Sequence, residues 1–298
     1  MRVFVTGATG FIGSAIVREL KSAGHQILGL ARSDEAAASL AAAGTEVHRG
    51  TLDDLDSLRR GAAASDGVIH TAFVHDFSDY AGAVRTDLRA VETLGEALAG
   101  SDRPFVITSG TAGLTPGRVV TEDDTPDAGS PAAARMPAEQ AALSTAARGV
   151  RASVVRLPPS VHGEGDHGFV PRLISIARAT GVSAYPGDGS NRWAAVHRLD
   201  AAHLFRLALE AAPAGARLHG VDEESVPVRD IADAIGRHLK LPVTAIPREQ
   251  AEAHFGWLGA FLSMDVPVSS TLTQKQLGWH PVQATLIADL EEGHYFTE

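Results

Sequence analysis

The sequence predicts an α/β protein built on a doubly wound parallel sheet, with a smaller lobe at the C-terminal end. Short apolar runs alternate with helical patterns over roughly the first 110 residues, and a glycine-rich turn joins the first run to the first helix. Such alternation is typical of parallel strands whose connecting helices cover both faces of the sheet. We expect strands near residues 2–6, 26–31, 45–48, 67–71, 104–108 and 152–157.

The clearest helical pattern lies between the fourth and fifth predicted strands. Apolar and aromatic residues recur there every three or four positions, as on one buried helix face: Tyr80, Val84, Leu88, Val91, Leu94 and Leu98. Gly, Thr, Pro, Asp and Ser cluster over residues 109–135, which predicts a loop. Further helices are expected near residues 137–148, 169–180, 199–211, 228–239 and 284–294.

The composition is that of a globular protein and excludes several classes of partner and site. Of 298 residues, 44% are hydrophobic and 21% are charged. The net charge of −10 gives no general attraction to nucleic acid or to anionic membranes. Cysteine is absent, which excludes disulfides and thiolate chemistry. Residues 1–5 enter a strand-like run directly and no apolar run approaches the ~20 residues of a membrane span, so we expect a cytoplasmic protein.

The strongest motif follows the first predicted strand and opens an amphipathic helix. It reads Thr6-Gly7-Ala8-Thr9-Gly10-Phe11-Ile12-Gly13. Glycine leaves room for a tight turn, for a diphosphate and for the packing of helix on strand. The helix start offers unpaired N–H groups and a positive dipole end. The motif predicts a Rossmann-type dinucleotide site whose contacts come from Gly7, Thr9, Gly10, Phe11, Ile12 and Gly13.

The end of the second predicted strand bears on the choice between NADP and NAD. A carboxylate at this strand end usually binds the ribose of NAD, whereas a nearby arginine accepts the extra phosphate of NADP. Ala31 offers no carboxylate and Arg32 offers a cation, which favours NADP. The alternative is that Arg32 is a solvated surface charge and Asp34 binds the ribose of NAD. Asp53, Asp54 and Asp56 begin a helix, where carboxylates favour the dipole, so no metal site is expected.

With these residues in view, the chain resembles the extended short-chain dehydrogenase/reductase superfamily of NAD-dependent epimerases, dehydratases and reductases. The similarity includes the glycine-rich turn and four later segments: 68–72, 105–109, 161–163 and 192–201. It implies a seven-stranded Rossmann domain over residues 1–160, completed by segments near 190–220, and a substrate lobe that takes up most of residues 161–298. It also implies cofactor contacts from Leu52, Thr71 and Ala72, and a homodimer formed through the helices near 80–99 and 137–148.

The sequence departs from this family where the family's catalytic tyrosine and lysine stand. The family spacing puts Pro131 in the tyrosine position and Arg135 in the lysine position, and the usual serine falls on Gly110. Arginine can hold the nicotinamide ribose but does not act as a base. The remaining candidates for catalysis are Ser109 or Thr111, which could orient a carbonyl, and His162, whose ordinary pKa suits proton transfer. The alternative is that His162 is a loop residue without a catalytic role.

The sequence indicates an NADP(H)-dependent oxidoreductase acting on a small carbonyl or alcohol, with NAD as the alternative cofactor. Tyr185, Arg192 and Trp193 are the predicted substrate contacts, although such aromatic residues more often only pack. An epimerase or dehydratase that uses the cofactor as a transient oxidant is a second interpretation. Because the proton donor is missing from its usual position, a non-catalytic NADP(H) sensor or scaffold is the third.

Overall fold

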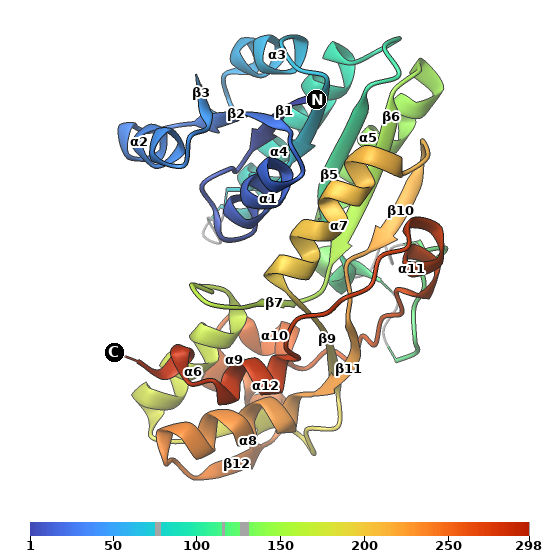
Figure 1. Ribbon diagram of the computed structural model, residues 1–298. Coiled ribbons are helices and arrows are strands. Elements are labelled where there is room, and N and C mark those ends of the chain that lie inside the picture. The colour runs from blue at the N-terminus through green and yellow to red at the C-terminus, as the bar shows by residue number, and fades with distance from the viewer. Residues whose placement is uncertain (75–78, 115–116, 126–130, 298) are drawn as a thin grey trace.

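The computed structural model describes residues 1–74, 79–114, 117–125 and 131–297. A seven-stranded parallel sheet forms its first part, in the order β10-β6-β5-β4-β1-β2-β3 (Figure 1). The strands are β1 (Arg2–Thr6), β2 (Gln26–Ala31), β3 (Glu46–Arg49), β4 (Gly67–His70), β5 (Pro104–Gly110), β6 (Arg151–Leu157) and β10 (Ala216–His219). The six predicted strands and the doubly wound fold class are therefore confirmed, and β10 adds the seventh strand.

Helices cover both faces of this sheet and bury separate hydrophobic clusters. On one face α1 (Phe11–Ser22) packs along α7 (Arg198–Ala211), with Ile16, Leu20 and Phe205 fully buried. On the other face α3 (Leu55–Ala63), α4 (Tyr80–Ala97) and α5 (Met136–Ser144) lie in a row over Phe4 and Phe105. The short helix α2 (Asp34–Ala42) connects β2 to β3. The sheet thus has two buried faces, as its nearly continuous apolar strands require.

A second lobe, on the lower side of Figure 1, carries two smaller sheets and most of the remaining helices, whereas α11 (Thr271–Leu277) lies beside β10 and α7 of the first part. Its sheets have the strand orders β11-β9-β7 and β12-β8. The strands are β7 (Ser160–His162), β8 (Ser183–Pro186), β9 (Arg192–His197), β11 (Glu223–Pro227) and β12 (Val243–Ile246). Its helices are α6 (Phe169–Thr180), α8 (Val228–Leu239), α9 (Ala251–Phe255), α10 (Leu258–Leu262) and α12 (Leu286–Glu291).

The predicted helices agree with these bounds, with differences at their ends. The helices expected at 169–180 and 228–239 have those ends as α6 and α8. The helix expected at 137–148 is α5 followed by a 3-10 turn over Thr145–Arg148. Two further 3-10 turns, Thr111–Gly113 and Pro131–Arg135, lie within the loop expected at 109–135, of which residues 115–116 and 126–130 are outside the described part. Within the described ranges, no helix is both long and apolar enough to cross a membrane.

Candidate cofactor and active site

The glycine-rich turn after β1 has no room for side chains. Gly7 has a φ of +71°, a left-handed conformation that favours glycine. A Cβ atom on Gly7 would lie 2.7 Å from the Thr71 Oγ1 atom. A Cβ atom on Gly13 would lie only 1.9 Å from the carbonyl oxygen of Gly7. Glycine at these two positions therefore lets the start of α1 lie directly against the turn.

The start of α1 is open to an anion. Its N-cap residue, Gly10, supplies no side-chain hydrogen bond, and the first helical bond runs from the Ser14 N–H to the Gly10 carbonyl. The N–H groups of Phe11, Ile12 and Gly13 therefore have no partner within the helix. Thr9 and Gly10 are exposed beside them. The predicted turn residues thus form a cradle that fits the diphosphate of a dinucleotide.

The other predicted cofactor residues follow the carboxyl ends of β4 and β3, at the same edge of the sheet. Thr71 and Ala72 follow β4, and both bond to Thr6 at the end of β1: the Thr71 hydroxyl donates to the Thr6 carbonyl over 2.8 Å. Leu52 lies partly buried after β3. In the sheet, β2 and β3 follow on one side of β1, whereas β5 and β6 follow on the other side of β4. The strand order therefore reverses between β1 and β4, and the carboxyl ends of these two strands form the crevice where open α/β sheets bind ligands.

Two arginines stand at the ends of β2 and β3. Arg32 is exposed, and it makes no hydrogen bond or ion pair in the described part of the chain. Arg49 is the register partner of Ala31, and its guanidinium lies 2.6 Å from the Asp34 carboxylate. Asp34, the alternative ribose ligand, is thus already held by a cation. Arg49 carries no local signal in the sequence, since its proximity to Asp34 depends on the pairing of β2 with β3.

Arg135 lies at the end of β5 beside a buried carboxylate. Its guanidinium donates to the Thr108 carbonyl over 3.1 Å and lies 3.5 Å from Asp87 on α4. The same group lies over the ring of Phe73, 4.4 Å from the ring centre. These contacts hold Arg135 near Ser109 and Thr111, so the structure brings three of the four predicted catalytic residues to one edge of the sheet.

Asp87 links Arg135 to the glycine-rich turn through a buried histidine. His70 Nε2 lies 3.1 Å from Asp87, and His70 Nδ1 lies 2.8 Å from the Thr6 hydroxyl. Burial alone would raise the pKa of Asp87, but the His70 hydrogen bond and the Arg135 charge more than offset it, so this pKa is lowered. A continuous polar path therefore runs beneath the crevice from β1 to Arg135.

Ser109 and Thr111 have different surroundings. Ser109 lies beside the Glu139 carboxylate and helps to lower the pKa of that group, whose burial is offset mainly by Arg156. Arg156 donates two hydrogen bonds to Glu139, over 2.5 and 3.1 Å. Thr111 is fully buried, and its hydroxyl has no hydrogen-bond partner among the described residues. Such an orphaned buried hydroxyl is costly unless something else satisfies it.

Tyr80, whose spacing predicts part of a buried helix face, lies next to Phe73 and Arg135. It is in the first turn of α4, and its ring centre lies 6.1 Å from that of Phe73, the ring on which Arg135 packs. Burial raises the pKa of Tyr80, while the charge of Arg135 opposes the rise. The helical spacing predicts that Tyr80 is a packing residue and does not indicate that it lies beside Arg135.

His162 lies in a different environment from the other catalytic candidates. It is 1% exposed, at the end of β7, and its Nδ1 atom lies 2.8 Å from Asp289 on α12. Its ring meets that of His197 edge to face. In the described chain no hydrogen bond joins it to Ser109, Thr111 or Arg135. This burial favours the structural alternative for His162 over a role in proton transfer.

The three predicted substrate residues are all engaged within the second lobe. Trp193 is 1% exposed and donates its indole N–H to the Phe261 carbonyl. Arg192 makes two side-chain hydrogen bonds to Asp265, over 2.9 and 2.8 Å. Tyr185 packs beneath the turn at Gly189, where a Cβ would lie 2.7 Å from its ring. Trp193 is a core residue in this arrangement, as its full burial and bonded N–H require.

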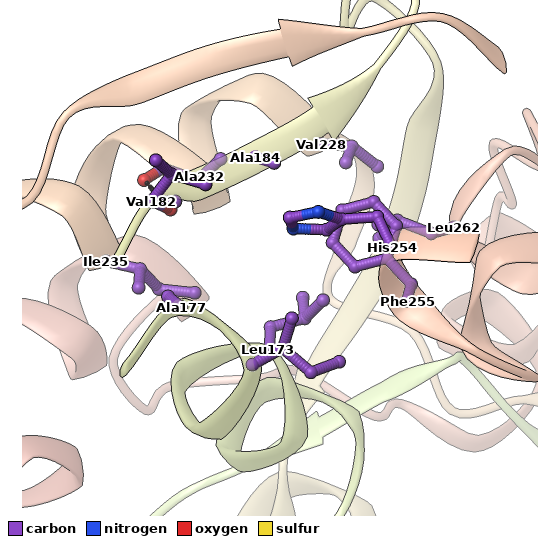
Figure 2. A pocket seen from close by; sticks show the side chains of 12 residues that line it. Leu173, Ala177, Val182, Ala184, Val228, Ala232, Ile235, His254, Phe255 and Leu262 are labelled. Atoms are coloured by element: carbon purple, nitrogen blue, oxygen red, sulfur yellow. Dashed lines mark hydrogen bonds between the residues drawn. The ribbon is translucent and has the colours of Figure 1, made fainter. Parts of the chain in front are cut away.

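A small cavity in the second lobe is too small for a substrate. Its volume is about 10 Å³, close to the least that holds one water molecule. Figure 2 shows that His254 points into it among apolar side chains from α6, β8 and α8. Desolvation lowers the pKa of His254. The cavity is a gap in the packing of this lobe and lies apart from the crevice.

Comparisons with known proteins agree on one family. Residues 3–219 match the model of the NAD dependent epimerase/dehydratase family. The uncharacterized protein C2A9.02 of Schizosaccharomyces pombe is 54% identical over 99% of this chain and all of its own length. A ketoreductase of Stigmatella aurantiaca, named for a farnesyl-dihydroquinoline-oxide substrate, is 30% identical over 86% of this chain and 80% of its own. The dTDP-glucose 4,6-dehydratase DesIV of Streptomyces venezuelae has a similar fold, with a TM-score of 0.81 and 19% identity over 99% of this chain and 97% of its own.

Proposed function

The chain belongs to the NAD dependent epimerase/dehydratase family, and we propose that it is a reductase that transfers hydride between NADP(H) and a small carbonyl or alcohol. The observation that carries this proposal is the side-chain-free cradle of Gly7 and Gly13 against the open start of α1. When bound, the nicotinamide supplies or accepts the hydride. The similarity to a ketoreductase supports reduction as the direction of the reaction.

The preference for NADP over NAD rests on the cations at the ends of β2 and β3. Arg32 is exposed and without a partner in the described chain, and Arg49 forms a surface ion pair with one oxygen of Asp34. A 2′-phosphate would gain charge-assisted hydrogen bonds there, whereas the ribose of NAD would find no free carboxylate.

Changing Arg32 tests this preference. We expect Arg32→Ala to raise the dissociation constant of NADP⁺ about tenfold or more and to leave that of NAD⁺ unchanged, since a hydrogen bond to a charged group is lost. Arg59→Ala is the matched control, because Arg59 is an exposed arginine on α3 that pairs locally with Asp56. Equal affinities of the Arg32 variant and the wild type for NADP⁺ would contradict the assignment.

Reduction of a carbonyl also needs a proton donor, and Tyr80 is the residue we propose for it. The substrate oxygen would lie at the Tyr80 hydroxyl, beside Arg135. As the carbonyl carbon accepts the hydride, its oxygen takes the phenolic proton of Tyr80. The Arg135 charge favours the phenolate that remains. Solvent then returns the proton, so the tyrosine ends unchanged.

Assays with a panel of small aldehydes and ketones, in which NADPH absorbance is followed, test both the reductase activity and the role of Tyr80 as proton donor. We expect turnover by the wild type, and a loss of about 10²- to 10⁴-fold in kcat for Tyr80→Phe with NADP⁺ affinity unchanged. Tyr185→Phe is the comparison variant, since Tyr185 is a predicted substrate contact in the second lobe whose loss should change KM and leave kcat near that of the wild type. No turnover of the panel by the wild type would refute the reductase, whereas an active Tyr80→Phe variant would refute only the proton donor.

An epimerase or dehydratase acting on a nucleotide sugar is less well supported. Such a substrate carries a diphosphate that needs cations in the second lobe. Arg192, the arginine expected to face the substrate, is paired with Asp265 through both side-chain nitrogens. Arg192 is therefore not free to hold such a diphosphate.

A further inference from the structure

Arg198 stands where the second lobe meets the start of α1. It is the first residue of α7, directly after β9. Its guanidinium carbon lies 5.0 Å from the centre of the Phe11 ring. Its stem runs along the loop after β7, where a Cβ atom on Gly163 would lie 3.2 Å from the Arg198 Cγ. The side chain is thus held between this loop and the opening residue of α1.

The charge of Arg198 has no matching acceptor. In the part of the chain that the structure describes, the guanidinium donates no hydrogen bond and has no carboxylate within 4.0 Å. Burial lowers the pKa of Arg198, and the positive charge of Arg18 lowers it further, while Glu164 and Asp166 act only from a distance. A partly buried guanidinium with five donors and a second cation beside it provides a favourable place for an anion.

Another arginine on the same helix shows the contrast. Arg206, two turns further along α7, donates to Glu19 over 2.7 Å and to Glu210 over 2.9 Å. Its charge is therefore used within the protein. Arg198 differs because its neighbours are the Phe11 ring and a loop whose carboxylates do not reach it.

The geometry points to Arg198 as a ligand of the cofactor diphosphate, reaching over Phe11 from the side opposite the glycine-rich cradle. The N–H groups at the start of α1 would hold the phosphates from below, and the guanidinium would hold them from above. The inference rests on the proposed binding of NADP(H) but not on any catalytic step. It adds to the site a residue that lies 185 positions after Gly13 in the sequence.

Binding of two nucleotides by calorimetry separates this role from a general effect on the site. NADP⁺ carries the diphosphate, whereas adenosine 2′-monophosphate carries only the adenine, the ribose and the 2′-phosphate. We expect Arg198→Ala to weaken NADP⁺ about ten- to a hundredfold and to leave the fragment unchanged. Arg198→Lys keeps a point charge without the planar fork, so its loss should be smaller. Arg206→Ala is the control on the same helix.

The outcomes distinguish this inference from the proposed function. If the wild type binds NADP⁺ and Arg198→Ala binds it equally well, Arg198 is not a ligand and the proposed function stands. If Arg198→Ala loses both nucleotides to the same extent, its effect is on the fold of the site and the inference fails. If the wild type binds no NADP⁺, both proposals fail. Unfolding curves without nucleotide establish whether the variants are folded. If Arg198→Ala does not fold, the affinity of Arg198→Lys for NADP⁺ tests the inference instead.

Discussion

Gly13→Ala is the sharpest test of the glycine-rich cradle. The new Cβ would lie 1.9 Å from the Gly7 carbonyl oxygen and 2.7 Å from its carbonyl carbon, where ordinary contacts begin at 3.4 Å. The Gly7 carbonyl also accepts the Gly10 N–H over 2.9 Å, so it cannot move aside alone. The turn must open by roughly 1.5 Å, and misplacing positioned groups by ~1 Å costs about 10²-fold.

We therefore expect Gly13→Ala to raise the dissociation constant of NADP⁺ at least about 100-fold, which corresponds to about 2.7 kcal/mol. Calorimetry measures this directly, and urea unfolding reports whether the protein is still folded. Gly24→Ala is the matched control: Gly24 has a φ of +83° with no atom within 4 Å of the added Cβ. It should cost about 1–2 kcal/mol of stability without changing cofactor affinity. Affinity of Gly13→Ala within about threefold of the wild type would refute the reasoning.

Two further predictions concern the buried charges that support the site. Glu139→Gln leaves Arg156 without its counter-charge and should cost about 3 kcal/mol in urea unfolding, whereas a loss below about 1 kcal/mol would show that the pair contributes little. Because the folded-state pKa of Glu139 is lowered from 4.5, its contribution is present above about pH 4.5 and is lost as pH falls through the folded pKa, so the wild type and the variant should converge in acid. Asp87→Ala leaves His70 and Arg135 without their acceptor and should cost about 1–3 kcal/mol of unfolding free energy. Asp87→Asn keeps an acceptor and should cost less. Equal losses of stability for the two variants would contradict this prediction.

The sequence was most informative where the hydrophobic pattern and turn chemistry are local. Six of the seven strands of the large sheet and the ends of α6 and α8 follow from apolar runs and helical periodicity. The glycine-rich turn is also largely local, because the positive φ of Gly7 and the clash of a Gly13 Cβ with the Gly7 carbonyl arise within eight residues, although Gly7 is further limited by Thr71. Such features need no knowledge of the rest of the fold.

The remaining parts depend on contacts between distant segments. The strands β7, β9 and β11 lie in the less regular second part of the chain, and their pairing joins segments 28 to 35 residues apart. The pairing of Arg192 with Asp265 spans 73 residues, and no local pattern indicates it. The local pattern likewise indicates only a packing role for Tyr80, and Arg198 stands out in the sequence only as part of the segment 192–201. Only the fold brings them to Phe73 and to Phe11.

Calorimetric titration of the purified protein with NADP⁺ and with NAD⁺ tests the central claim most directly. The cradle at the start of α1 and the cations Arg32 and Arg49 predict saturable binding of NADP⁺ with a dissociation constant below about 100 µM, and of NAD⁺ at least about tenfold more weakly. Binding of neither nucleotide at millimolar concentration would contradict the claim that this chain uses a nicotinamide dinucleotide.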